Sequence, residues 1–147
     1  MNEVNGHKKN GILKTWKAVQ LKDIVSVLGD GLHGTPIYSD DGEYFFINGN
    51  NLEDGKIVLK ENTKRVSFEE YKRLRKELND RTILVSINGT IGNVAFYNNE
   101  KVILGKSACY FNVLDNVDKK FLKLLLSSRR FLNYAFGTAT GSTVLAP

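Results

Sequence analysis

The side chains that could do chemistry are few and far apart in this chain. Its histidines are His7 and His33, and its single cysteine is Cys109. A zinc site needs several cysteine and histidine ligands, so this inventory excludes one. Cys109 lies in an apolar segment, as a buried structural thiol does, and one cysteine forms no intrachain disulfide. We therefore expect no cofactor, no metal and no catalysis, in a reducing cytoplasmic setting.

One group of residues has the form of a nuclease metal site. Glu70-Tyr71-Lys72 matches the E-x-K pattern of Mg²⁺-dependent nucleases, with Asp54 upstream. Those nucleases hold their metal with carboxylates on adjacent strands. Glu70, however, follows Ser67 at the spacing of a helix capping box, in which its carboxylate caps the backbone of Ser67. This structural role explains Glu70, and a small Mg-dependent nuclease is kept as an alternative function.

A glycine series is the second pattern of chemical interest. Gly29-Asp-Gly31-Leu-His-Gly34 matches the G-x-G-x-x-G of dinucleotide sites. That motif binds pyrophosphate only between a buried strand and the N-terminus of a helix. Here Thr35-Pro36 and a polar stretch follow in place of a helix. We interpret the glycines as part of a loop that can approach a ligand.

The basic charge of the chain favours a polyanionic partner. Its 147 residues include 21 Lys and Arg against 16 Asp and Glu, for a net charge of +5. Basic side chains that neutralise phosphates release counterions, which favours binding to nucleic acid. Many of the lysines and arginines lie in the middle of the chain, at Lys56, Lys60, Lys64, Arg65, Lys72, Arg73, Arg75, Lys76 and Arg81. A protein-interaction module with incidental basic charge is the other alternative.

Length and composition indicate one domain. A chain of 147 residues can bury one compact core and is too short for two ordinary domains. Residues 1–13 are polar and lack periodicity, so we expect a flexible N-terminal arm before a domain over residues 14–147. No apolar run reaches the roughly 18 residues that a membrane span needs, and the N-terminus lacks the apolar stretch of a signal peptide.

Periodicity and turn residues predict the elements that must position these groups. Apolar residues at helical spacing predict a short helix or helix-like turn over residues 18–28, ended by Gly29, and then a loop over 29–42. Further helices should begin after Ser67 and after Asp118, the latter running to about Tyr134. Strands are expected at residues 44–47, 57–59, 82–87, 93–97, 101–104 and 108–114. Short, mostly antiparallel strands with separate helices indicate an α+β fold.

Two turns carry polar side chains suited to contact with a ligand. Asn88-Gly89 is a strong turn dipeptide because both residues tolerate positive φ. Around it, Ser86, Asn88 and Thr90 offer small hydrogen-bonding groups. The second turn, Asn48-Gly49-Asn50-Asn51, offers carboxamides that can pair with adenine. Asparagine and glycine are equally explained as turn formers.

Five blocks of the chain follow an order that is typical of one family. The run from Leu84 to Ala95 has the form S-x-x-G-T-I-G-x-x-A. Before it come a W-x-x-x-x-L-x-D-I block at Trp16, a G-x-T-P-type loop at Gly31 and an asparagine-leucine block from Phe46 to Ile57. After it comes an F-L…G-S-T block from Phe121. The chain thus resembles the target-recognition domains of type I restriction–modification specificity subunits over residues 16–145.

The resemblance implies a single compact target-recognition domain that binds double-stranded DNA and performs no catalysis. Specificity subunits carry two such domains, each reading one half of a bipartite site, joined by long helices that hold the methylation subunits. With one domain present, the resemblance implies a fragment or a half-length subunit, which would meet the methylation and restriction subunits only if spacer helices are supplied. The residues expected to contact DNA are His33, Gly34, Thr35, Asn48, Asn50, Asn51, Lys64, Arg65, Ser86, Asn88, Thr90, Ser142 and Thr143.

Overall fold

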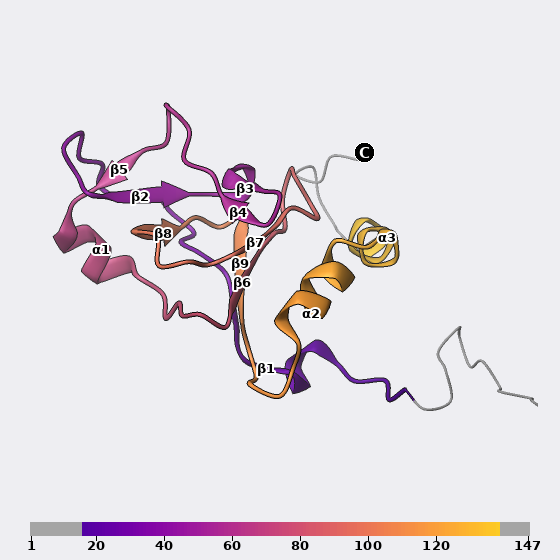
Figure 1. Ribbon diagram of the computed structural model, residues 1–147. Helices are drawn as coiled ribbons and strands as arrows, with labels where there is room; N and C mark the ends of the chain where they lie inside the picture. Colours follow the sequence, from indigo (N-terminus) through magenta and orange to yellow (C-terminus); the bar gives the residue numbers. More distant parts are fainter. Residues whose placement is uncertain (1–15, 139–147) are drawn as a thin grey trace, which may run out of the picture.

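A four-stranded antiparallel sheet forms the middle layer of the molecule. The computed structural model describes residues 16–138 (Figure 1). The strands of this sheet, in spatial order, are β1 (Val25–Gly29), β9 (Ala108–Val113), β6 (Thr82–Ser86) and β7 (Val94–Phe96). Strand β6 is buried along its whole length. Its continuous run of β-branched and aliphatic residues is what a strand covered on both faces requires.

The two faces of β6 belong to two separate clusters of apolar side chains. Leu84 packs with Ile47, Leu52 and Leu104 on one face. On the other face, Ile83 and Val85 pack with residues of the C-terminal helices, among them Leu122 and Leu126. Successive side chains of a strand point to opposite faces, so a single strand joins both clusters.

A smaller sheet and a short hairpin cover the first face. The sheet has the order β5 (Arg65–Val66), β2 (Tyr44–Ile47), β8 (Val102–Leu104), with β2 and β8 parallel. The hairpin pairs β3 (Leu52–Glu53) with β4 (Lys56–Ile57). Its turn residues Asp54 and Gly55 both have positive φ. That geometry matches the right-handed twist of the strands, and an Asp-Gly pair adopts it readily.

Helices cover the opposite face and one end of the small sheet. In Figure 1, α2 and α3 lie on one side of the central sheet and α1 lies beside β8 on the other. The helices are α1 (Phe68–Leu74), α2 (Lys119–Leu126) and α3 (Arg129–Thr138), with 3-10 turns η1 (Leu21–Asp23) and η2 (Gly49–Asn51). The Asp118 carboxylate caps α2 by accepting from Lys120 N at 2.9 Å and Phe121 N at 3.1 Å. None of the helices within residues 16–138 is long and apolar enough to cross a membrane.

The α+β fold and most of the predicted strands are confirmed, with two clear errors. The short helix or helix-like turn predicted over residues 18–28 is present only as the 3-10 turn η1, and its second half is wrong, because Val25–Gly29 is the strand β1, which pairs with β9. The single final helix is also wrong, because it breaks between α2 and α3. At the break, the hydroxyls of Ser127 and Ser128 donate to the carbonyls of Lys123 and Leu125. Such back-bonding competes with the next turn of helix.

Other predictions shift by a few residues or stay untested. The strand expected at 57–59 is β4, Lys56–Ile57, and it pairs with β3 rather than with β2. The Asn-rich turn contains the 3-10 turn η2. The predicted N-terminal arm at residues 1–13 lies outside the described residues, and the domain bounds 14–147 stay a prediction.

Leu84 offers a direct test of the packing around β6. We expect Leu84→Ala to lower the free energy of unfolding by about 2–5 kcal/mol, because it opens a cavity in a fully buried site. Leu124→Ala is the matched control, since that side chain on α2 is 65% exposed and its loss should change the value by at most about 0.5 kcal/mol. Urea unfolding measures both. Equal effects of the two substitutions would contradict the assignment of Leu84 to the core.

Candidate nucleic-acid interface

The turn between β8 and β9, Gly105–Lys106–Ser107, joins the loops that carry most of the predicted site residues. The Ser107 hydroxyl accepts a hydrogen bond from Gly49 N at 2.8 Å and donates to Asn48 Oδ1 at 3.0 Å. The Ser107 carbonyl accepts from Ile87 N at 3.1 Å. One residue therefore holds η2 and the β6–β7 loop together. We call Gly105–Ser107 the junction turn.

The loop after β1 reaches the same place. Leu32 N donates to the carbonyl of Leu104 at 2.7 Å, and Leu32 forms a parallel bridge with Gly105. Gly31 lies so close that an added Cβ would be 2.2 Å from the carbonyl oxygen of Gly105. His33, Gly34 and Thr35 follow directly. Three chain segments thus meet at the junction turn.

Glycine makes this close meeting sterically feasible. An added Cβ on Gly105 would lie 2.2 Å from Asn48 Oδ1, and one on Gly49 would lie 2.1 Å from Ser86 Oγ. Both distances are far shorter than a van der Waals contact. The glycines therefore allow the backbones of the joined segments to pack directly against polar side chains.

Two of the predicted DNA contacts, Ser86 and Asn51, have side chains that are buried and hydrogen-bonded within the chain. Ser86 is 1% exposed and donates to the carbonyl of Asn88 at 3.2 Å. Asn51 is 5% exposed; its amide donates to the carbonyl of Val58 at 3.0 Å, and its oxygen accepts from Asn48 N. These hydrogen bonds hold the shapes of the two turns, and a DNA contact by either residue stays a prediction.

The other predicted residues of these two turns differ in their contacts: some side chains are hydrogen-bonded within the protein, and others are open to solvent. Asn48 is half-buried and held by Ser107. Thr90 is exposed, with its hydroxyl 2.8 Å from Ser86 Oγ. Asn50 is exposed and Asn88 half-exposed, and neither side chain forms a hydrogen bond with another described residue. The amides of Asn50 and Asn88 are therefore open to a ligand.

The loop after β1 presents its predicted residues to solvent. His33, Gly34 and Thr35 are all exposed. His33 Nε2 hydrogen-bonds to the Asp30 carboxylate, and this bond lowers the pKa of Asp30 below its ordinary value. No helix follows Gly34, in agreement with our interpretation of the glycine series as a loop rather than a dinucleotide site.

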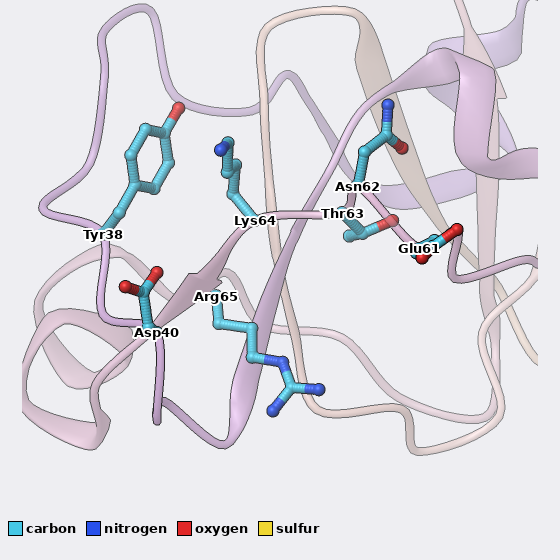
Figure 2. A pocket seen from close by; sticks show the side chains of 7 residues that line it. All are labelled: Tyr38, Asp40, Glu61, Asn62, Thr63, Lys64 and Arg65. Atoms are coloured by element: carbon cyan, nitrogen blue, oxygen red, sulfur yellow. The ribbon is translucent and has the colours of Figure 1, made fainter.

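Lys64 and Arg65 lie on the outer edge of the small sheet, beside the C-terminal end of the loop that follows β1. Tyr38 forms a bridge with Val66, and Ser39 N donates to the carbonyl of Arg65 at 2.9 Å. An open hollow of about 500 Å³ lies here, lined by Tyr38, Asp40, Glu61, Asn62, Thr63, Lys64 and Arg65 (Figure 2). Figure 2 shows Tyr38 and Lys64 next to each other, and the Lys64 ammonium is 5.8 Å from the Tyr38 ring centre.

Lys106, at the tip of the junction turn, is a candidate that sequence reasoning missed. It is exposed, and its side chain forms no hydrogen bond or ion pair with another residue in the described part of the chain. Its neighbours Gly105 and Ser107 mark a turn in the sequence. The sequence does not disclose that this turn meets two other loops. An unpaired ammonium at such a meeting point is suited to a phosphate.

Glu70 does not have the environment of a nuclease ligand. The Ser67 hydroxyl accepts from Glu70 N at 3.2 Å, as predicted for the start of α1. The Glu70 carboxylate does not cap the Ser67 backbone, which corrects that part of the prediction: it accepts from Ile37 N and from Arg73. Among the described residues, no three His, Cys, Asp or Glu side chains are grouped as a metal site would require.

Cys109 is half-buried in β9. Its thiol lies 2.9 Å from the carbonyl oxygen of Gly29, and burial raises its pKa to about 11. A thiol with so high a pKa is almost wholly protonated near neutral pH, which is unfavourable for a nucleophile. The remaining predicted contacts, Ser142 and Thr143, lie outside the described residues.

Fold and site together define a small α+β domain whose exposed loops meet at one turn. Residues 13–146 match the family model of the type I restriction modification DNA specificity domain. The chain belongs to this family. No curated protein matches the chain.

Solved structures share this fold. The HsdS subunit from Thermoanaerobacter tengcongensis matches with a TM-score of 0.59 and 15% identity, over 82% of this chain and 29% of that one. The type I restriction-modification system S subunit from M. genitalium matches with a TM-score of 0.51 and 21% identity, over 84% and 28%. The chain therefore spans less than a third of the length of either subunit.

Gly49 tests whether close packing at the junction turn is required. We expect Gly49→Ala to lower the free energy of unfolding by about 1–3 kcal/mol, because the new methyl must displace Ser86. Gly34→Ala is the control: an added Cβ there meets nothing within 4 Å, so the change should be at most about 0.5 kcal/mol. Urea unfolding of both variants measures the difference. A Gly49→Ala protein as stable as Gly34→Ala would contradict the geometry.

Proposed function

We propose that this chain reads one half of a bipartite site in double-stranded DNA, through the loops that meet at the junction turn. The observation that supports the proposal is the convergence of three loops on Ser107 and its glycines. We call the exposed and half-exposed polar side chains of these loops and of the junction turn the reading surface; they are His33, Thr35, Asn50, Asn88, Thr90 and Lys106. They come from four separate parts of the sequence.

The chemistry of the reading surface suits direct readout of bases. The carboxamides of Asn50 and Asn88 can pair with adenine through one donor and one acceptor. The hydroxyls of Thr35 and Thr90 can donate to, or accept from, base edges or phosphates. Gly34 has open space around its Cα, so a DNA backbone can come close to the loop there.

Basic residues set the position of the DNA but carry no sequence information. Lys106 is proposed to contact a phosphate beside the reading surface, and Lys64 and Arg65 to contact phosphates further along the duplex. The acids Asp40 and Glu61 line the hollow beside Lys64 and Arg65. We therefore assign these two residues to the edge of the interface and not to its centre.

The chain is proposed to act without catalysis and as part of a larger assembly. One recognition domain contacts few base pairs, so half-site binding should be weak alone and tight when two domains are linked. The methylation and restriction subunits of a type I complex are the proposed protein partners, in the cytoplasm. The membership of the chain in the specificity-domain family supports these partners.

Selection from a randomised duplex pool at two salt concentrations tests the proposal. We expect a short, asymmetric motif to be enriched, with affinity falling as salt rises. Lys106→Ala should reduce the slope of log K against log salt by about 0.9, because one phosphate contact is lost. The enriched motif should not change.

Lys120→Ala is the matched control for Lys106. Lys120 is exposed at the start of α2, and its neighbour Lys119 hydrogen-bonds to Asp80, beyond the start of β6. The reading surface lies past the other end of β6. The Lys120 variant should therefore keep the wild-type salt slope. No retention of DNA at low salt, or retention with no enriched motif, would contradict the proposed function.

A further inference from the structure

Glu70 is a buried carboxylate that the proposed reading surface leaves unexplained. Its side chain is 7% exposed. Oε1 accepts from Ile37 N at 2.9 Å, Oε2 accepts from Arg73 Nε at 3.0 Å, and Arg73 Nη2 completes a bidentate ion pair. These hydrogen bonds lower the pKa of Glu70, with that from Arg73 contributing most. A carboxylate enclosed in this way needs all of these donors, since an unpaired buried charge is costly.

Formation of helix α1 does not account for this arrangement. The N-cap of α1 is Ser67, whose hydroxyl binds Glu70 N and not its carboxylate. The neighbouring acid, Glu69, points to solvent and pairs with Lys72 at 3.0 Å, as an ordinary surface residue does. The Glu70 carboxylate instead reaches across to a residue 33 positions earlier in the chain. Its distinctive contact is with the loop that precedes β2.

That contact lies in the middle of the loop, between two other attachments. At its start the loop is held by Leu32 N on Leu104, and near its end by Ser39 N on Arg65. Between them, Pro36 is buried and Ile37 N binds Glu70. The segment with His33 and Thr35 is therefore held at both ends, and the Glu70 hydrogen bond holds it at a third point, next to these exposed residues.

The Glu70 hydrogen bond leaves the Ile37 side chain pointing out of the molecule. Ile37 is 72% exposed, the highest value among the large apolar residues that the structure describes. Its backbone is held by an interior hydrogen bond while its side chain stays in water. The C5-methyl of thymine in the major groove is read by apolar contact, and an exposed aliphatic side chain on a hydrogen-bonded backbone is suited to it.

We propose that Ile37 is a specificity-determining residue that contacts a thymine methyl, and that Glu70 is the positioning residue that holds Ile37 outward. The inference rests on the proposed function and extends it by one base contact. Arg73 also contributes, because its guanidinium pairs with the Glu70 carboxylate and reduces the repulsion between that negative charge and DNA phosphates.

Base preferences of point variants test the inference. Each variant is selected on the randomised duplex pool, and its affinity for the best site is compared with that for single-base changes of the site. Ile37→Ala should lose preference for thymine at one position by about tenfold, and keep the preferences elsewhere. Glu70→Ala should lose the same preference, because the loop is no longer braced. The double variant should lose no more than Ile37→Ala alone.

Two conservative variants serve as controls. Glu70→Gln retains an oxygen that can accept from Ile37 N, so it should retain most of the thymine preference. Glu69→Gln changes the adjacent exposed acid and should match the wild type. A role of Glu70 confined to stability would lower binding to all sequences alike and leave the base preferences intact.

Several results would overturn the inference. They are an unchanged thymine preference in Ile37→Ala, an unchanged preference in a folded Glu70→Ala protein, or equal losses at every base position. If Glu70→Ala does not fold, Ile37→Ala still tests the base contact. Glu70→Asp then tests the positioning role, because its shorter side chain keeps a negative charge beside Arg73 but should lose the bond to Ile37 N and, with it, the thymine preference. If the wild type itself enriches no motif, the proposed function fails. A wild-type motif that is insensitive to Ile37 and Glu70 overturns this inference alone.

Discussion

The hydroxyl of Ser107 is the contact on which the arrangement of the loops most depends. It accepts from Gly49 N and donates to Asn48, while the carbonyl of the same residue holds Ile87. A side chain that both donates and accepts in an enclosed place satisfies two groups at once, so no buried polar atom is left unpaired there. The surrounding glycines supply the space. Since β8 and β9 lie in different sheets, the turn between them also ties the two sheets together.

The central sheet could be predicted from the sequence because its signals are local and strong. The buried run of β6 and the turn at Asn88-Gly89 predict strands on both sides, and the structure has β6 and β7 there. The apolar spacing from Leu21 to Leu28 fits a helix or helix-like turn, but only Leu21–Asp23 forms such a turn, because pairing with β9 makes Val25–Gly29 a strand. That pairing joins residues more than 80 positions apart, and local periodicity carries no information about it.

The candidate site could be predicted only in part, for a related reason. The sequence identifies polar residues in turns, but it cannot tell which ones bond to the protein itself. Asn50 and Asn51 are neighbours of one type, yet the first is exposed and the second is buried against Val58. The sequence marks a turn at Lys106 but shows neither that this turn meets other loops nor that Ile37 is bound to Glu70. The proposed DNA contacts of Lys106 and Ile37 depend on hydrogen bonds that Ser107 and Glu70 form with distant segments of the chain.

DNA is proposed to bind where the three loops meet, and amide chemical shifts of the ¹⁵N-labelled chain measure this contact residue by residue. The chain would be titrated with the enriched duplex and with a duplex of scrambled sequence. We expect the enriched duplex to shift the amides of residues 33–35, 37, 49–50, 87–91 and 106, and the scrambled duplex to shift them less. Shifts confined to α2 and α3, or equal shifts with both duplexes, would contradict it.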